Sequence, residues 1–406
     1  MEGYAENLLG YTHSQMDSLE YKLTHRTSPK HFTRESRLNF ANTVLLVLNL
    51  VKKSVRAEAM SLYRRLGEVV KTPSRPAINE ARDKLSYTAF KDLFDKSCSL
   101  ASQSSETARV YKGYRLLSVD GTSFPVGPHE KLREYFGDST TIPGKAMCRI
   151  GAIVDVLNDC IVMAKVTKFS EGERAIAIEQ VKALKEMSNA LYIFDRGYWS
   201  PDLVASIDGN GQKFIIRLSS KVKNPVAKDD NDDTINLRKV SFTLPNGKSS
   251  TLVTNLSEEE ITDEELAELY TKRWGIETKY YELKERLQIN KLSREAGNAI
   301  LQDIYATLYI SNLVAFICFE VDAKLAQEES SSKYERKAKR AVCISAIRDR
   351  FVTLCLHDHP AHRALELDIL VADLRSEITY SRKSSARVRK RIRRKASCRG
   401  AALPVL

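Results

Sequence analysis

Residues 190–198 read ALYIFDRGY, and this short run decides the fold class. Five apolar or aromatic residues are followed at once by Asp195, which predicts a buried strand ending at a carboxylate. A similar run leads to Asp120, where residues 114–122 read YRLLSVDGT. Neighbouring strands lie about 4.8 Å apart, so two such carboxylates can lie side by side at one sheet edge.

The segments around these two runs predict a mixed α/β core. Strand-like runs separated by the turn Asn158-Asp159 follow Asp120, and helical and strand-like runs alternate on both sides of Asp195. The expected strands are 114–124, 149–157, 161–169, 190–194 and 213–218, and the expected helices are 173–184 and 200–207. Three strands, a helix, a strand, a helix and a strand indicate an RNase H-like mixed sheet.

An insertion and two helical regions complete the expected domain organisation. Residues 219–262 contain an acidic stretch at 229–233 and β-type runs at 240–244 and 251–255, which predict a β-rich insertion. Helical periodicity dominates residues 32–100, then 263–287 and 298–327. We therefore expect an all-helical N-terminal domain over residues 1–105, a catalytic domain over 106–327 that includes the insertion, and a C-terminal helical region over 328–406.

The N-terminal helical region has two open interpretations, a DNA-binding module or an ordinary helical domain. Its short predicted helices carry interleaved cations that suit DNA binding. These are Arg56, Arg64, Arg65, Lys71, Arg75, Arg82 and Lys84.

Charge and cysteine usage limit the class of protein. The formal net charge is +12, and ten Lys or Arg residues lie between Arg382 and Arg399, which leaves about +2 for the remaining chain. This tail is either a disordered solubilising end or a sequence-independent phosphate contact. Seven single cysteines without a CxxC pair favour a reducing compartment and argue against structural zinc.

The chain is not expected to enter a membrane. The N-terminus lacks the basic and apolar regions of a signal peptide. The longest uncharged apolar run, Ile304 to Phe319, is shorter than a typical membrane span and predicts a buried helix. These features favour a cytoplasmic protein.

A third acidic residue follows the two aspartates. Tyr270, Arg273, Glu277 and Lys284 are spaced by 3, 4 and 7 positions, offsets that return to one face of an α-helix. Taken alone, such a stripe is usually a solvated, salt-bridged face. Three carboxylates with no nearby Cys or His favour a hard cation such as Mg²⁺.

These motifs resemble those of the bacterial insertion-sequence transposases of the "IS four" group. Their Y-x2-R-x3-E-x6-K signature is present in full from Tyr270 to Lys284. Asp195-Arg196-Gly197-Tyr198 matches the motif of their second catalytic aspartate, and Val119-Asp120-Gly121-Thr122 matches that of the first. The resemblance covers at least residues 34–320, and the three motifs in this order make it specific.

The resemblance implies a cut-and-paste DNA transposase of the bacterial nucleoid. Asp120, Asp195 and Glu277 would hold Mg²⁺, or Mn²⁺ in its place, and two ions are expected. Water would cleave transposon ends, and the freed 3′-OH would attack target DNA. Tyr270, Arg273, Lys284 and Arg196 would contact DNA. The partners would be double-stranded terminal inverted repeats, target DNA and a second copy in a homodimer.

Two alternative functions and one mechanistic question stay open. A domesticated or inactive transposase derivative would bind DNA without cutting it, and an RNase H-like nuclease would cut without strand transfer. Some similar transposases use a Trp in the insertion to stabilise a flipped base during hairpin formation. Trp199 and Trp274 both lie outside residues 219–262, so a hairpin step would need a substitute such as Phe242.

Overall fold

One sheet organises the chain, and its strand order is β3-β2-β1-β4-β5-β7-β6. The computed structural model describes residues 1, 3–49, 55–65, 72–103, 107–140, 142–229, 231–243, 249–328, 333–356 and 359–381. The strands are β1 (Arg115–Gly127), β2 (Ala146–Asp155), β3 (Cys160–Lys168), β4 (Ala190–Phe194), β5 (Lys213–Arg217), β6 (Arg238–Thr243) and β7 (Ser249–Thr254).

The pairing of these strands is mixed. β1 pairs antiparallel with β2 and parallel with β4, and β4 pairs parallel with β5. The expected α/β fold with an RNase H-like core is therefore confirmed. The β-rich insertion does not stand apart from this core, because β7 pairs antiparallel with β5 and extends the same sheet.

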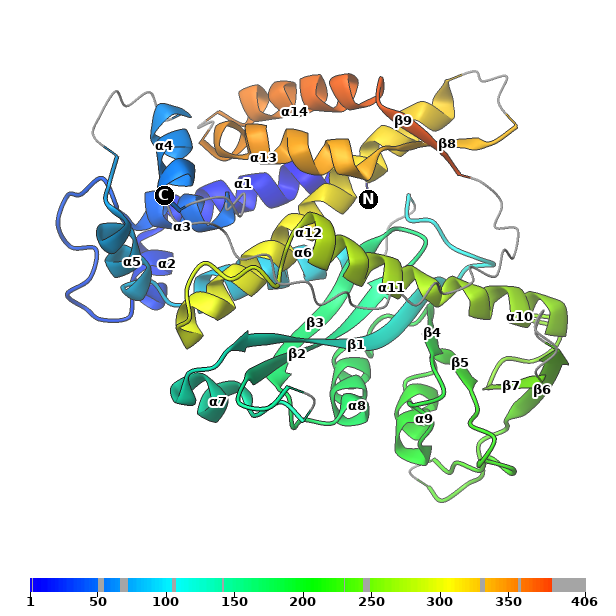
Figure 1. The fold of residues 1–406 in the computed structure, drawn as a ribbon. Coiled ribbons are helices and arrows are strands. Elements are labelled where there is room, and N and C mark those ends of the chain that lie inside the picture. Colours follow the sequence, from blue (N-terminus) through cyan, green and yellow to red (C-terminus); the bar gives the residue numbers. More distant parts are fainter. Residues whose placement is uncertain are drawn as a thin grey trace, which may run out of the picture.

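Helices cover both faces of the sheet (Figure 1). One face packs against α8 (Glu173–Ala183) and α9 (Pro201–Asp208). The other face packs against α6 (Thr88–Ser102), α10 (Asp263–Lys272), α11 (Trp274–Tyr281) and α12 (Gly297–Gln327).

Alternation along β1 determines which way Asp120 points. Leu117 and Val119 enter the core on the α8 side, whereas the Ser118 hydroxyl bonds to the start of α11. Because side chains alternate along a strand, Asp120 falls on the α11 side together with Ser118.

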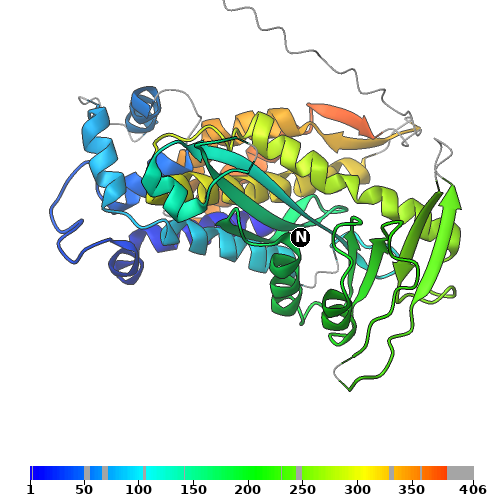
Figure 2. The same cartoon turned by 60° about the horizontal axis from the view of Figure 1, so that its bottom comes forward.

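The N-terminal and C-terminal helices share one hydrophobic core. Thr12 of α1 (Tyr4–Asp17) hydrogen-bonds Tyr309 of α12 at 2.7 Å. His13 of α1 contacts the carbonyl oxygen of Cys355 in α13 (Arg340–Leu356) at 2.9 Å. Figure 2 shows these helices lying together beside the sheet. The other N-terminal helices are α2 (Leu19–His25), α3 (Phe40–Leu48), α4 (Val55–Arg65) and α5 (Arg75–Asp83). In the C-terminal region, α14 (Pro360–Leu374) follows α13.

The long helix α12 runs through the middle of this core. Its length and hydropathy would suffice for a membrane span, but 94% of the apolar window is buried inside the protein. Asn312, near its centre, accepts from the Ile161 amide at 2.8 Å and donates to the Ile161 carbonyl at 2.9 Å. The helix thus serves as a core element, as its sequence predicted.

Three features differ from the sequence-based expectations. β1 continues to Gly127, beyond the expected end at residue 124, because its pairing with β2 runs from Leu117 to Gly127 with one register shift after Pro125. A short helix, α7 (Glu130–Phe136), follows and ends at Gly137, whose φ of 88° suits glycine. The C-terminal region adds a two-stranded sheet of β8 (Glu335–Ala338) and β9 (Ile378–Ser381). The basic tail from residue 382 onward lies outside the described residues.

Candidate active site

Strand register brings the first two predicted carboxylates together. Val119 of β1 is paired with Phe194 of β4, and Asp120 and Asp195 are the next residues on the two parallel strands. Paired positions on neighbouring strands are about 4.8 Å apart, which defines the scale of their separation. β4 ends at Phe194, so Asp195 emerges at a strand end while Asp120 remains within a strand.

Asp120 is held in a partly buried position. Its Oδ1 accepts the backbone N–H of Gly121 at 2.9 Å, and its carbonyl oxygen accepts the hydroxyl of Tyr280 at 2.7 Å. Burial raises the pKa of Asp120 to about 6, and the negative charges of Glu173 and Glu277 add to this, while the Gly121 amide and the Arg273 guanidinium oppose it. The site therefore concentrates like charges that a bound cation would relieve.

Arg273 links the third predicted carboxylate to this pair. Its Nη2 donates to Glu277 Oε1 at 3.0 Å, and its carbonyl oxygen accepts the Ser118 hydroxyl at 3.0 Å. The second bond fixes the start of α11 to β1 two residues before Asp120. The Arg273 side chain is only 8% exposed, compared with 42% for Glu277, and its guanidinium lies 4.9 Å from the Trp274 ring centroid.

Tyr270 completes the chain of contacts. Its hydroxyl donates to Asp195 Oδ1 at 3.3 Å. Burial raises the pKa of Tyr270 to about 12, and the Asp195 charge adds to this, so the phenol stays protonated at neutral pH. Arg273 also lies near this ring, with 6.0 Å between the guanidinium carbon and the ring centroid. Tyr270, Arg273 and Glu277 therefore surround the two aspartates from the helical side.

Lys284 and Arg196 make no hydrogen bond or ion pair with this cluster in the part of the chain that the structure describes. The spacing argument assumed a regular α-helix through Lys284, but residues Glu282–Arg286 form a π turn closed by the Leu287 N–H and the Glu282 carbonyl at 2.9 Å. This wider turn moves Lys284 from the position that α-helical spacing assigns to it. Within the described residues neither cation makes a hydrogen bond or ion pair; Arg196 is exposed, whereas Lys284 is half-buried, which lowers its pKa.

A buried ionic network anchors the helix that carries Glu277. Lys279, 1% exposed, contacts Asp159 Oδ1 at 2.8 Å and Glu282 Oε1 at 3.2 Å. Arg340 of α13 binds both acids, at 2.5 Å from Asp159 Oδ2 and 2.9 Å from Glu282 Oε1. These cations hold the pKa of Glu282 well below its usual range despite burial. The network joins the π turn, the β2–β3 turn and the C-terminal region.

Sequence reasoning missed Glu173, the first residue of α8. A Cβ at Gly121 would lie 2.9 Å from Glu173 Oε1, so Gly121 allows this carboxylate to approach β1. Glu173 also lies 3.8 Å from Arg149 Nε. No motif marks Glu173, and only the packing of α8 against β1 places it near Asp120.

The donor set fits a hard divalent cation, although the three carboxylates do not form a closed ligand group. Oxygen donors with no Cys or His among them suit Mg²⁺ or Mn²⁺. Within the described ranges, no three acidic, His or Cys side chains are arranged to hold a metal ion as they stand. Glu277 instead forms its ion pair with Arg273. This ion pair engages Oε1 of Glu277, so Arg273 and a bound cation would compete for that oxygen.

Comparison with known proteins decides the family. The family described as "Transposase DDE domain" matches residues 111–313, which is half of the chain. The chain belongs to this family of DDE transposases. A curated relative, "Putative transposase for insertion sequence element IS4SA" from Synechocystis sp. (strain ATCC 27184 / PCC 6803 / Kazusa), is 25% identical over 287 residues, covering 65% of this chain and 78% of the relative.

A structural comparison gives a weaker similarity. The cryo-EM structure of a piggyBac transposase synaptic complex with hairpin DNA aligns with a TM-score of 0.47 and 12% identity, over 91% of this chain and 83% of that one. The fold is therefore identified by the mixed sheet, in which the strands have the order β3-β2-β1-β4-β5. As a DDE transposase, the chain is a DNA-cleaving and strand-transferring enzyme of a family that uses divalent metal ions.

Proposed function

We propose that Asp120, Asp195 and Glu277 are the catalytic and metal-binding residues of a cut-and-paste transposase. The parallel register of β1 and β4 carries this proposal, because it brings two carboxylates from distant motifs to neighbouring positions. Tyr270 and Arg273 then connect Asp195 and Glu277 from a single helical segment. This arrangement supports hydrolysis of a phosphodiester at each transposon end, followed by joining of the freed 3′-OH to target DNA.

The three carboxylates are proposed to hold two Mg²⁺ ions, with Mn²⁺ as a substitute. Two such ions supply activation of the attacking oxygen and stabilisation of the leaving oxygen. Asp120 and Asp195 provide oxygen donors from rigid strands, and Glu277 provides one from an exposed helix position. The raised pKa of Asp120 reflects burial and unneutralised neighbouring charge, both of which favour a cation at this place.

Four further residues are proposed to contact DNA. Arg273 offers a planar fork that matches phosphate oxygens, and its Nε is buried without a hydrogen-bond partner. Lys284 and Arg196 offer cationic groups that no carboxylate neutralises in the described part of the chain. Tyr270 keeps its phenolic proton and can donate to a phosphate oxygen. The DNA partners would be the terminal inverted repeats and the target, bound by a homodimer in the bacterial cytoplasm.

Residues 1–105 are proposed to contribute to recognition of transposon ends, and residues 328–406 to form a C-terminal region with a basic tail. Arg82, one of the N-terminal cations considered above, is not available for DNA because it forms a buried ion pair with Asp303 at 2.8 Å. Since α1–α6 share a core with α12–α14, end recognition should be tested by cation substitutions in the full chain.

A strand-transfer assay tests the proposed function directly. The full chain, an end duplex from the inverted repeats flanking its gene, a plasmid target and Mg²⁺ should yield joined products. An RNase H-like nuclease would give only nicks, and an inactive derivative would bind the end without cutting it. Either result would contradict the proposal.

Replacing Arg273 by Met should strengthen metal binding and weaken cleavage. The guanidinium repels an incoming cation and occupies Glu277, so its loss should raise Mn²⁺ affinity at least about fivefold, equivalent to about 1 kcal/mol, the energy of two unit charges about 4 Å apart at the dielectric constant of water. Cleavage should fall because the phosphate contact is lost. Calorimetric Mn²⁺ titration without DNA measures the first effect, with Lys272→Met on the exposed side of the same segment as control. Weaker Mn²⁺ binding by folded Arg273→Met would contradict this competition.

Deleting residues 382–406 should make DNA binding less sensitive to salt. Each phosphate contact contributes about 0.9 to the slope of log affinity against log salt concentration, and the tail carries ten cations. Affinity for end DNA and for random DNA should fall about equally. Titrations of both duplexes at several salt concentrations measure this. An unchanged slope with selective loss of end binding would show instead that the tail contributes to specific recognition.

A further inference from the structure

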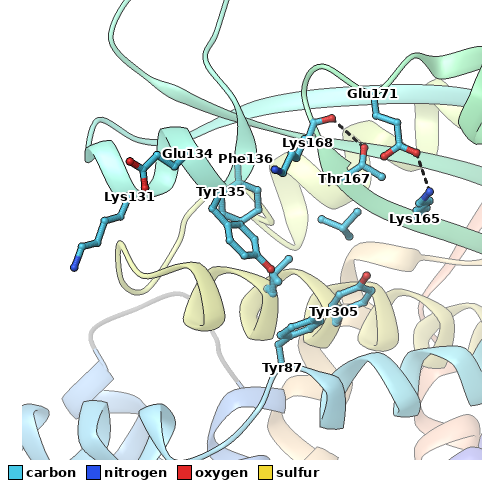
Figure 3. Close-up of a pocket in the computed structure, with 12 residues that line it drawn as sticks. Tyr87, Lys131, Glu134, Tyr135, Phe136, Lys165, Thr167, Lys168, Glu171 and Tyr305 are labelled. Atoms are coloured by element: carbon cyan, nitrogen blue, oxygen red, sulfur yellow. Dashed lines mark hydrogen bonds and ion pairs between the residues drawn. The ribbon is translucent and has the colours of Figure 1, made fainter. Parts of the chain in front are cut away.

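A second candidate binding site lies away from the catalytic carboxylates. A cleft of about 620 Å³ opens between α7, the end of β3 and the first half of α12, and we call it the α7 cleft. Figure 3 shows the side chains that line it. Its volume lies in the range of small-molecule sites, about 300–1,000 Å³, and so accommodates a nucleotide.

Tyrosines form one wall of the α7 cleft. The rings of Tyr87 and Tyr305 stack with their centroids 6.0 Å apart and their planes 14° from parallel. Tyr135 reaches from α7 toward this pair and is 46% exposed (Figure 3). A Cβ at Gly297, the first residue of α12, would lie 3.8 Å from the Tyr135 ring, so the ring rests on the helix start. A half-exposed aromatic ring supported from behind provides a surface for stacking.

Lysines form the rim of the cleft. Lys131 and Lys168 are exposed and make no ion pair within the described ranges, whereas Lys165 is held by Glu171 at 2.8 Å. Glu134 is the one lining carboxylate that is likewise unpaired in the described structure. The rim thus offers two available ammonium groups against one carboxylate. Aromatic rings beside lysines are the combination that binds nucleic-acid strands through base stacking and phosphate contacts.

The cleft lies within reach of the catalytic carboxylates. Val166 at its floor pairs with Ile150, which pairs with Thr122, two residues beyond Asp120 on β1. Two strand spacings across and two residues along place the Cα atoms of Val166 and Asp120 about 12 Å apart. A DNA strand advances about 3.4 Å per nucleotide along the duplex axis, so this offset corresponds to three or four nucleotides.

We propose that the α7 cleft binds a nucleotide of the DNA strand that runs past the catalytic carboxylates. The base stacks on Tyr135, and Lys131 and Lys168 contact adjacent phosphates. This inference rests on the proposed function, because it requires DNA at Asp120 and Asp195. It assigns DNA positioning to α7, a helix outside the three catalytic motifs.

Photocrosslinking tests the contact itself. The full chain is bound to end duplexes that carry 5-iododeoxyuridine at single positions, irradiated, digested and mapped by mass spectrometry. The peptide containing Tyr135 should crosslink at one or two adjacent positions, about three or four nucleotides from the cleaved phosphate. If end binding persists and this peptide crosslinks at no position, the inference is wrong.

Substitutions test the energetic contribution of the cleft. Tyr135→Leu should weaken end binding about 5- to 100-fold, as expected for loss of one base–aromatic stack, and Tyr135→Phe should restore it. Tyr380→Leu, at a tyrosine of similar exposure on β9, should leave binding unchanged. Lys131→Ala and Lys168→Ala should each lower the salt slope by about 1, whereas Lys185→Ala, at an exposed lysine in the turn after α8, should not.

The outcomes separate this inference from the proposed function. Wild-type protein that cleaves and joins end DNA, together with Tyr135→Leu that binds it equally well, would refute the cleft assignment alone. A change in oligomeric mass for Tyr135→Leu without any change in DNA binding would identify the cleft as a protein contact and would also refute it. Absence of cleavage by the wild-type protein would instead count against the proposed function.

Discussion

Glu277→Gln should reduce cleavage of end DNA by about a thousandfold or more and leave end binding within about twofold. The substitution keeps the shape of the side chain and removes the charge proposed to hold a divalent ion. A lost metal ligand costs several kcal/mol of transition-state stabilisation, and each 1.4 kcal/mol is a factor of ten in rate. Single-turnover cleavage in Mg²⁺ and a binding titration of the same duplex measure the two effects.

Glu268→Gln is the matched control for this experiment. Glu268 is an exposed acid of α10 in the same helical segment, outside the motif. Cleavage by this variant should equal that of the wild-type protein. Glu277→Gln protein that cut at the wild-type rate would remove Glu277 from the catalytic group. Equal loss in both variants would indicate a general effect on the helix.

Arg340→Leu should lower the free energy of unfolding by about 3–5 kcal/mol, the usual cost of breaking a buried ion pair by removing one partner. Glu282 is only 5% exposed, and without Arg340 it would keep Lys279 alone as a cationic partner among the residues that the structure describes. Cleavage should also fall, since the network fixes the π turn directly after the helix carrying Glu277. Denaturant unfolding and cleavage of the folded variant provide the two measurements.

Arg350→Leu provides the comparison on the same helix. Arg350 pairs with Asp373 at 2.5 Å, and both side chains are well exposed to solvent, so the substitution should cost no more than about 1 kcal/mol. Equal destabilisation by the two substitutions would show that the buried network contributes no more to the free energy of unfolding than an exposed ion pair does.

The sequence predicted β1 and β4 well because they carry strong local signals. The buried runs before Asp120 and Asp195, together with the order of the strand-like and helical runs around them, predicted the mixed sheet. Glu173 could not be found this way, since its position depends on how α8 packs across Gly121. The π turn at Lys284 also could not be predicted from helical spacing, because it is stabilised by buried contacts of Glu282 with α12 and α13.

The proposed competition between Arg273 and a metal ion for Glu277 also could not be predicted from the spacing. Residues four apart on a helix commonly pair, so the spacing was equally compatible with a surface salt bridge. Arg273 is buried and contacts Ser118 and Trp274, and these features distinguish this ion pair from a salt bridge on the surface of a helix.

The core shared by the two ends of the chain has a consequence for biosynthesis. His13 of α1 is synthesised 342 residues before its partner Cys355 on α13. At about 5–20 residues per second, α1 waits on the order of half a minute for its contacts with α13, although α3 and α6 can cover part of its apolar face earlier. A prematurely terminated chain therefore lacks these partners. We expect such products to aggregate or be degraded, so a damaged copy of the gene would yield little protein able to occupy transposon ends.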